Sequence, residues 1–480
     1  MKKFVSLIVA AALLGTAAGC KKKEEVKEEG GAITLKVLMP AEQQKDLNLV
    51  MDEVNKITEE KIGTKIDMVF IDSGAYTEKM NMKLATKEYF DVCFTSSWLN
   101  PYDKGVNNNA YYPLTKLIDE YAPKLKDEMP DYWWEAVKRN GEIYAVPNQQ
   151  VASTTIAFTM NKNWADKYNV DIDSIKTAND IEPFLETVKQ NEPDYFPMRP
   201  YGNYWVKNYE AITSVVGLDK RESGKLKAIY NWDAEGYTYG LQKLREWFEK
   251  GYFRSDVGSV LDDSSDFYGN KYIVTGTGWK PGFEATQSAV LGGEHVTMKI
   301  GNPIVTGDSL IGTMYSISAY SNYPEKAIEY IELVNTDKDL YNLLCYGIEG
   351  KHYDWVDDNH IKMNENGGYY VNSSWEFGNQ FNAYLLEGQE DNIWEETKAF
   401  NDSAEKSKLL GFVVDTSNIQ TEITQISTVQ SEYKNMLNNG SLDWKENFEE
   451  YKKKMMAAGA ENVLNEVQRQ LDEFAKSTNN

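Results

Sequence analysis

The sequence predicts an α/β protein with two domains, and three observations lead to this prediction. Short apolar runs alternate with segments in which apolar residues recur every three or four positions. This alternation is typical of a parallel or mixed sheet with helices on both of its faces. The chain has 480 residues, which is too many for one hydrophobic core and enough for two. No stretch after the first twenty residues is long and apolar enough for a transmembrane helix.

The N-terminus has the three-part layout of a secretory signal peptide. Lys2 and Lys3 precede an apolar stretch at residues 4–14, and small residues follow at 15–19. The apolar stretch is too short to span a bilayer stably, so the segment is expected to be removed from the mature chain.

The small residues end at Cys20 in the sequence AAGC, which resembles the lipobox of bacterial lipoproteins, with Ala17 where Leu is usual. The resemblance implies that Cys20 carries a lipid and is the first residue of the mature chain. The alternative is ordinary secretion with an unmodified Cys20. Residues 21–31 are almost entirely charged or glycine, so they cannot bury enough apolar surface to fold. We expect them to form a tether between membrane and body.

The body begins with alternating strands and helices. The first expected elements are a strand at 34–39, a helix at 47–57, a strand at 65–71, a helix at 76–86 and a strand at 91–95. The same pattern resumes with a strand at 151–160 and helices at 180–190 and 237–250. Residues 446–476 are predicted to be helical, with a break at Gly459.

Composition limits the kind of partner. The formal net charge of −23 argues against binding to nucleic acid or to anionic lipid through the body. Tyr outnumbers Phe, 31 to 17, and there are 12 Trp, a set of rings that suits a polar ligand with apolar patches. Cys93 and Cys345 are the only cysteines after Cys20, and both are expected as small buried side chains. Two cysteines exclude a disulfide framework but leave a single bond between them open.

Several segments resemble the extracellular solute-binding proteins of sugar importers, the family that includes maltose-binding protein. They are YFDVCF at 89–94, NGEIYAVP at 140–147 and SAYSNYPEKA at 318–327. The runs at 346–353, 410–412 and 466–472 are similar to a branch of LipO-type lipoproteins with a C-terminal domain of unassigned role. The resemblance implies a periplasmic-binding-protein-like (type II) α/β fold, with two lobes joined by a hinge and the ligand cleft between them.

The same resemblance divides the chain. After the signal peptide (1–19) and the lipidated tether (20–31), it implies an N-terminal lobe of 32–150 plus 304–345. The C-terminal lobe is expected to take 151–303 plus 346–480, with 346–480 as the family-specific C-terminal region.

The function implied by the resemblance is that of the substrate-binding lipoprotein of an ABC transporter. Such a protein captures a carbohydrate, here an oligosaccharide, by lobe closure and delivers it to the permease subunits in the membrane. The resemblance also implies a monomer without cofactor, held outside the cytoplasm by its lipid alone. That place is the cell surface in a single-membrane bacterium and otherwise the periplasmic side.

Candidate ligand contacts follow the predicted strands of the first lobe. Trp98 and Asn100 come directly after the strand at 91–95, at a carboxyl end where open α/β sheets bind their ligands. Gln149 and Gln150 follow Pro147 at the presumed first crossing between lobes, where their amides could reach sugar hydroxyls. Core packing for Trp98 and solvated loop positions for the amides are the alternatives.

The second lobe offers further candidates. Asn203 and Trp205 belong to an aromatic cluster that is either a stacking wall or a core. The resemblance makes Trp279, in TGTGWKPG at 275–282, a sugar contact, with packing between the lobes as its alternative. Phosphate binding there is disfavoured, because the glycine spacing is not G-x-G-x-x-G. Tyr346 and Glu349 lie in the segment that resembles LipO-type lipoproteins, so they are candidates too. The alternative is that this segment resembles the family only because its glycines form tight turns.

Catalytic and metal-binding signatures are weak, so we expect neither a catalytic nor a metal site. The S-x-x-K pattern at 403–406 lacks its partner motifs, and the 74 carboxylates make any chosen pair uninformative. The motifs H-E-x-x-H, C-x-x-C and G-x-S-x-G do not occur. The remaining alternatives are a receptor for a peptide or another solute, a lipoprotein glycoside hydrolase and a surface adhesin.

Overall fold

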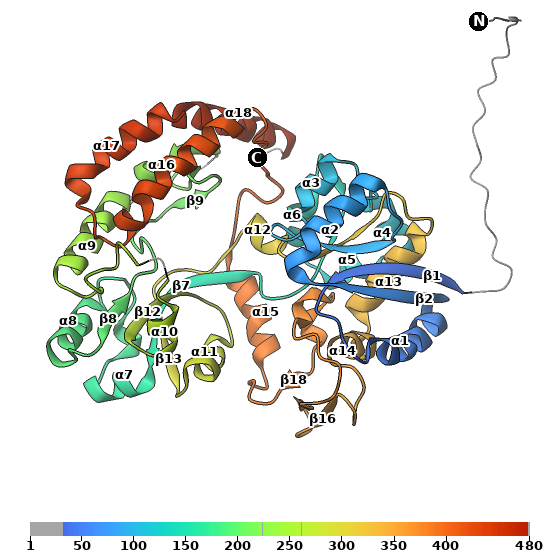
Figure 1. Ribbon diagram of the computed structural model, residues 1–480. Coiled ribbons are helices and arrows are strands. Elements are labelled where there is room, and N and C mark those ends of the chain that lie inside the picture. Colours follow the sequence, from blue (N-terminus) through green and yellow to red (C-terminus); the bar gives the residue numbers. More distant parts are fainter. Residues whose placement is uncertain (1–31, 223, 261, 479–480) are drawn as a thin grey trace, which may run out of the picture.

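The computed structural model describes residues 32–222, 224–260 and 262–478. The predicted signal peptide, Cys20 and the whole tether at 21–31 lie outside these residues. Within them, no helix combines the length and the apolar character needed to cross a membrane. The chain forms two lobes that lie side by side, with a layer of C-terminal helices over one of them (Figure 1).

The first lobe is built on a five-stranded sheet of order β2-β1-β3-β15-β6. Its strands β1 (Ile33–Pro40), β2 (Thr64–Ile71) and β3 (Val92–Thr95) are parallel, and β15 (Met314–Ile317) lies antiparallel to both β3 and β6 (Val146–Pro147). These strands are rich in Val, Ile, Leu and Phe because helices cover both faces of the sheet. The strands predicted at 34–39, 65–71 and 91–95 are confirmed.

The apolar stripe that predicted the helix at 47–57 is buried in the first lobe. In α1 (Leu47–Ile62), Val50, Met51 and Val54 are buried, and Gly63 ends the helix with φ 65°. The other helices are α2 (Ser73–Thr86), α3 (Tyr102–Asn107), α4 (Thr115–Tyr121), α5 (Lys124–Glu128), α6 (Asp131–Val137), α12 (Gly307–Leu310), α13 (Pro324–Thr336) and α14 (Lys338–Tyr346), and a hairpin pairs β4 (Lys138–Arg139) with β5 (Glu142–Ile143).

The second lobe is built around β7 (Ser153–Asn161), the predicted strand at 151–160. The strands β12 (Tyr272–Trp279), β13 (His295–Lys299) and β14 (Ile304–Val305) lie antiparallel to β7, while β8 (Phe196–Arg199) is parallel to β12 and β19 (Glu405–Lys406) is parallel to β14. Its helices are α7 (Lys162–Tyr168), α8 (Glu182–Asn191), α9 (Tyr237–Glu249), α10 (Ser264–Tyr268) and α11 (Phe283–Leu291), with 3₁₀ turns η1 (Ile172–Ser174) and η2 (Asn231–Asp233).

The C-terminal helices share a separate core with a small antiparallel sheet of the second lobe. That sheet has the order β11-β10-β9 and is made of β9 (Tyr209–Ala211), β10 (Val216–Asp219) and β11 (Lys227–Tyr230). The helices α16 (Gln420–Asn438), α17 (Trp444–Ala457) and α18 (Ala460–Thr478) pack against it. Gln468 of α18 bonds to the edge of β11, accepting from Ala228 N (2.7 Å) and donating to Leu226 O (2.9 Å).

Residues 346–404 differ from the expected division, which places all of 346–480 in the second lobe. Tyr346, Tyr369 and Phe377 are buried in the core of the first lobe, and the backbone N–H of Asp46 donates to Gly368 O (3.0 Å). The segment therefore packs on the first lobe, and only the part after residue 408 joins the C-terminal core. It contains β16 (Tyr353–Trp355), β17 (His360–Met363), η3 (Ser374–Glu376), η4 (Gln380–Asn382), β18 (Leu385–Leu386) and α15 (Ile393–Ser403).

Candidate functional site

Three strand ends lie side by side where the chain passes between the lobes. The start of β7 pairs with β14, and β14 pairs with β19. Asn401, at the end of α15, holds the first passage: its Oδ1 accepts from the backbone N–H groups of Ala152 (2.8 Å) and Ser153 (3.2 Å), and its Nδ2 donates to Gln150 O (2.8 Å). A few residues that carry a whole junction in this way are typical of a hinge.

An exposed aromatic platform lies on the first lobe at the carboxyl end of β3. Trp98 is 57% exposed, and its indole N–H donates to Gly312 O (2.8 Å). The ring centroid of Trp98 is 6.1 Å from that of half-buried Trp375. The Ser96 hydroxyl accepts from the backbone N–H groups of Trp98 (3.2 Å) and Leu99 (2.7 Å), which fixes the loop that presents Trp98. We call this pair the Trp98–Trp375 platform.

The buried side chain of Asn100 holds this loop by hydrogen bonds to the interior of the lobe. It is 3% exposed and has φ 50°, a conformation that Asn tolerates better than most residues. Its Nδ2 donates to Phe94 O (2.9 Å) and to the Tyr111 hydroxyl (3.2 Å). Its side chain is thus engaged inside the lobe, and we assign it to positioning Trp98.

The two predicted glutamines lie at the passage between the lobes but have different surroundings. Gln150 donates from Nε2 to Thr313 Oγ1 (2.6 Å). Gln149 is 6% exposed, and its Nε2 has no hydrogen-bond partner among the described residues. Its backbone oxygen accepts from Gln380 N (2.8 Å), which ties the passage to the segment that carries Trp375.

An exposed tyrosine, Tyr201, follows strand β8 of the second lobe. Because β8 and β12 are parallel, their carboxyl ends meet at one edge of the sheet. Tyr201, in the loop after β8, is 58% exposed. It lies over Gly276 and Gly278 of β12, where an added Cβ would come within 2.5 Å of Tyr201 Cβ and 3.6 Å of its hydroxyl. Gly276 therefore makes room for Tyr201 and Tyr204, whereas the contact at Gly278 is an ordinary one. The exposure of Tyr201 could not be read from the sequence alone.

Trp279 is enclosed in this arrangement of the lobes. It is 8% exposed, and its indole N–H donates to Glu284 Oε1 (2.8 Å). Lys299 Nζ lies 3.3 Å from its ring centroid, and Phe400 packs against the ring at 5.1 Å and 88°. Stacking of a ligand on Trp279 would require this cover to move, so its role stays a prediction.

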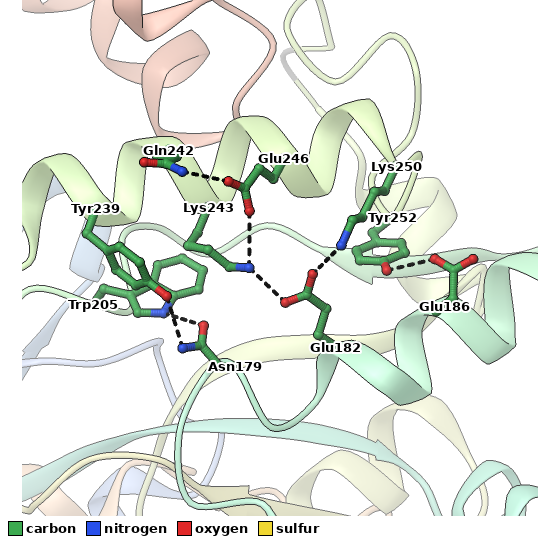
Figure 2. Close-up of polar contacts among 10 residues, drawn as sticks. All are labelled: Asn179, Glu182, Glu186, Trp205, Tyr239, Gln242, Lys243, Glu246, Lys250 and Tyr252. Atoms are coloured by element: carbon green, nitrogen blue, oxygen red, sulfur yellow. Dashed lines mark hydrogen bonds and ion pairs between the residues drawn. The ribbon is translucent and has the colours of Figure 1, made fainter.

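Asn203 and Trp205 are bound into the second lobe. Asn203 Nδ2 donates to Tyr237 O (2.9 Å), and the indole N–H of Trp205 donates to Asn179 Oδ1 (3.0 Å). Figure 2 shows Trp205 beside Tyr239 and next to the ion pairs that join α8 to α9 through Glu182, Lys243, Glu246 and Lys250. Trp205 is also packed against Trp247 (5.2 Å between centroids). These contacts hold the loop that begins with Tyr201.

Tyr346 and Glu349, predicted as a pair, lie in different surroundings. Tyr346 is 3% exposed, stacks between Tyr370 (6.4 Å) and Tyr384 (6.5 Å), and burial raises the pKa of its hydroxyl. Glu349 is exposed at a turn that bridges to Tyr353. Among the described residues, neither side chain makes a hydrogen bond or a ring contact with Trp98, and we leave both out of the proposed site.

A buried carboxyl lies next to the platform. Glu376 is 4% exposed, and burial raises the pKa of its carboxyl from 4.5 to about 8, although the Ser373 hydroxyl donates to it (2.9 Å) and acts in the opposite direction. Asn148 Nδ2 donates to the backbone oxygen of Glu376 (2.8 Å), so the turn that carries Trp375 is bonded to the passage between the lobes. Nothing in the sequence distinguishes Glu376 from the other carboxylates.

A cavity of about 350 Å³ opens beside the platform, between the lobes. Its walls come from α3, α6 and α12 of the first lobe, from β9, and from residues 409–414. None of the predicted ligand contacts lines it, but Ser97, the neighbour of Trp98, does.

Comparison with known proteins gives two matching family models. The family described as bacterial extracellular solute-binding protein matches residues 41–340. A domain of unknown function (DUF3502) matches residues 408–476, which corresponds to the C-terminal helices and the segment before them.

Two curated proteins are similar in sequence. A carbohydrate ABC transporter substrate-binding protein of Streptococcus pneumoniae is 27% identical over 485 residues, covering 98% of this chain and 97% of the relative. Lipoprotein LipO of Bacillus subtilis is 22% identical over 283 residues, which are 55% of this chain and 53% of LipO.

The fold matches the crystal structure of the N-glycan transport solute-binding protein NgtS from Streptococcus pneumoniae. The TM-score is 0.81 at 26% identity, covering 93% of this chain and 100% of that one. The TM-score is lower for the NgtS complexes with Man1GlcNAc (0.67) and Man5GlcNAc (0.64). The overall arrangement of this chain is therefore closer to the NgtS structure described without a glycan.

Proposed function

Because this chain belongs to the family of bacterial extracellular solute-binding proteins, we propose that it captures an oligosaccharide between its lobes for an ABC permease. The observation that carries this proposal is the exposed Trp98–Trp375 platform at the carboxyl end of β3, in a fold that matches NgtS. Full-length similarity to a carbohydrate substrate-binding protein supports the same cargo. These relatives are transport proteins, and we extend the proposal to a chain with no catalysis of its own.

Capture would proceed by bending at the passages between the lobes. Trp98 and Tyr201 are exposed rings, one on each lobe, and we propose that both contact the ligand. Flat rings can cover the C–H faces of a sugar, while nearby amides such as that of Gln150 take its hydroxyls. A ligand that contacts both lobes binds the closed arrangement more tightly, and this difference in affinity drives closure.

The platform gives the first testable prediction. Replacing Trp98 by Ala should weaken the binding of Man5GlcNAc about tenfold, the equivalent of about 1.4 kcal/mol, because the exposed ring is lost. Isothermal titration calorimetry measures this change. Trp355→Ala is the matched control, since Trp355 is 39% exposed on a hairpin away from the platform and its loss should leave affinity unchanged. Equal affinities of wild type and Trp98→Ala would remove the platform from the site.

We further propose that the protein is a monomer held outside the cytoplasm by a lipid on Cys20, with residues 21–31 as the tether. The family match supports an extracytoplasmic location, and the lipobox-like sequence at Cys20 supports anchoring by a lipid.

The anchor gives a second prediction. Cys20→Ala should abolish incorporation of labelled palmitate and move the protein from the membrane fraction to the soluble one, because the lipid is the proposed attachment. Cys93→Ala, which removes a buried cysteine, should keep both the label and the membrane association. Retention of Cys20→Ala in the membrane fraction would show that another attachment exists.

A further inference from the structure

The cavity between the lobes has walls from three parts of the chain. Tyr102 and Asp103 belong to the first lobe, and Glu210 and Ile212 come from β9 or its end. Residues 409–414, the start of the C-terminal region that matches the domain of unknown function, form the third wall. Figure 1 shows this segment rising from α15 between the lobes toward the C-terminal helices.

This third wall packs against both the C-terminal core and the core of the first lobe. Leu409 is buried in the C-terminal core, while Leu410 packs against the core of the first lobe. Gly411 has φ 79°, and a Cβ there would come within 2.7 Å of Glu135 O. The segment therefore lies close against α6, and only glycine combines this φ with so close an approach.

The lining mixes polar and apolar groups. Asp103, Arg139, Asp308 and Glu210 supply hydrogen-bonding groups, and Ile212 and Phe412 supply apolar surface. The guanidinium of Arg139 is paired with Asp103. Burial raises the pKa of the Glu210 carboxyl, against the effect of a hydrogen bond from Ser407. A volume of about 350 Å³ is within the range of about 300–1,000 Å³ that is usual for small-molecule sites.

Two residues of the cavity wall are chain neighbours of residues in the proposed site. Ser97 and Ile311 line it, and they are adjacent in sequence to Trp98 and to Gly312, the residue that accepts the indole N–H of Trp98. Ser97 N also donates to Ile311 O (2.9 Å), so these two walls are bonded together. A ligand lying on the platform could extend into the cavity.

We propose that this cavity is a second sugar-binding subsite, for the distal part of a neutral oligosaccharide, and that the C-terminal region exists in part to complete it. The inference rests on the proposed function and gives a role to the domain of unknown function. Three carboxyl groups face a single guanidinium that is already paired, so an anionic sugar is disfavoured. Carboxylates beside apolar surface suit a ligand that has hydroxyls and C–H faces.

The test fills the cavity and compares two glycans of different size. Ala211 is exposed on β9 and lines the cavity, so Ala211→Trp should occupy it without disturbing a core. Ala457→Trp, at an exposed position of α17 outside the cavity, is the matched control. Calorimetry with Man1GlcNAc and Man5GlcNAc should show Man5GlcNAc weakened about tenfold by Ala211→Trp and Man1GlcNAc changed by less than about twofold.

Each outcome decides between the possibilities. Selective loss of Man5GlcNAc affinity supports the subsite. No change with either glycan, or parallel loss with both, overturns it while the receptor function stands. Failure of the wild-type chain to bind either glycan overturns the proposed function and this inference with it. If Ala211→Trp lowers the midpoint of thermal unfolding, Val413→Trp, at another exposed position of the lining, repeats the test with the same criteria.

Discussion

Glu376→Gln should stabilise the protein at pH 7 by roughly 3 kcal/mol. The carboxyl is buried and its pKa is raised from 4.5 to about 8, so the folded chain holds it protonated at neutral pH. The unfolded chain ionises it freely and is favoured by that ionisation. Glutamine has the shape of the protonated carboxyl but does not ionise in the unfolded chain, so the substitution removes this advantage.

The pH dependence gives the sign of the effect. A raised pKa in the folded state means that the folded chain binds the proton more tightly than the unfolded chain. The contribution of Glu376 to stability is therefore complete below pH 4.5 and is lost as the pH rises toward about 8. We expect the difference in unfolding free energy between Glu376→Gln and wild type to be near its minimum at pH 4.5 and to grow up to pH 8.

Urea denaturation at several pH values between 4.5 and 8 measures this difference. The control is Glu365→Gln, at an exposed position of the same segment, which should shift stability by less than about 0.5 kcal/mol at every pH. A Glu376→Gln variant that is less stable than wild type at pH 8 would mean that the buried carboxylate has a partner that holds it charged.

Asn401→Ala should destabilise the protein by roughly 3–5 kcal/mol, since it leaves several buried groups without partners. Asn401 is 4% exposed, and its Oδ1 accepts from Ala152 N, Ser153 N and the Ser153 hydroxyl. Its Nδ2 donates to Gln150 O, and alanine can replace none of these bonds.

Thermal and urea unfolding measure the loss. The control is Asn392→Ala, at the residue before the same helix. Within the described part of the chain the Asn392 side chain bonds to exposed Glu396 alone, so the substitution should cost less than about 0.5 kcal/mol. A loss below about 1 kcal/mol for Asn401→Ala would show that the passage is held by the strand pairing of β7, β14 and β19 alone.

The sequence predicted the elements of both lobes well because their apolar residues follow the periods of strands and helices. The stripe of α1 and the apolar run of β3 are examples, and both lie within the predicted ranges. The assignment of the last third of the chain to the two lobes was harder to predict. Residues 346–404 pack on the first lobe through Tyr346, Tyr369 and Phe377, and no local pattern states which of two cores an apolar side chain joins.

The candidate site could be predicted only in part, because several of its residues come together through long-range contacts. Trp98 follows a predicted strand, so its position at the edge of the sheet could be expected. The sequence shows an aromatic cluster at 201–205, but it does not indicate that Tyr201 is exposed while Trp205 is buried. Asn401 contacts Ala152, and Trp375 contacts Trp98, although more than two hundred residues separate the partners in each pair. Such long-range contacts cannot be predicted from local sequence patterns.

The most direct test of the central claim is small-angle X-ray scattering of the chain from residue 32 onward, with and without saturating Man5GlcNAc, with binding confirmed by calorimetry in the same buffer. Closure of the lobes on the glycan predicts a smaller radius of gyration and a shorter maximum dimension in the complex. The unliganded curve should fit the arrangement of the lobes described above, which matches the NgtS structure described without a glycan at a TM-score of 0.81. Saturation of the protein with Man5GlcNAc at an unchanged radius of gyration would contradict capture by lobe closure.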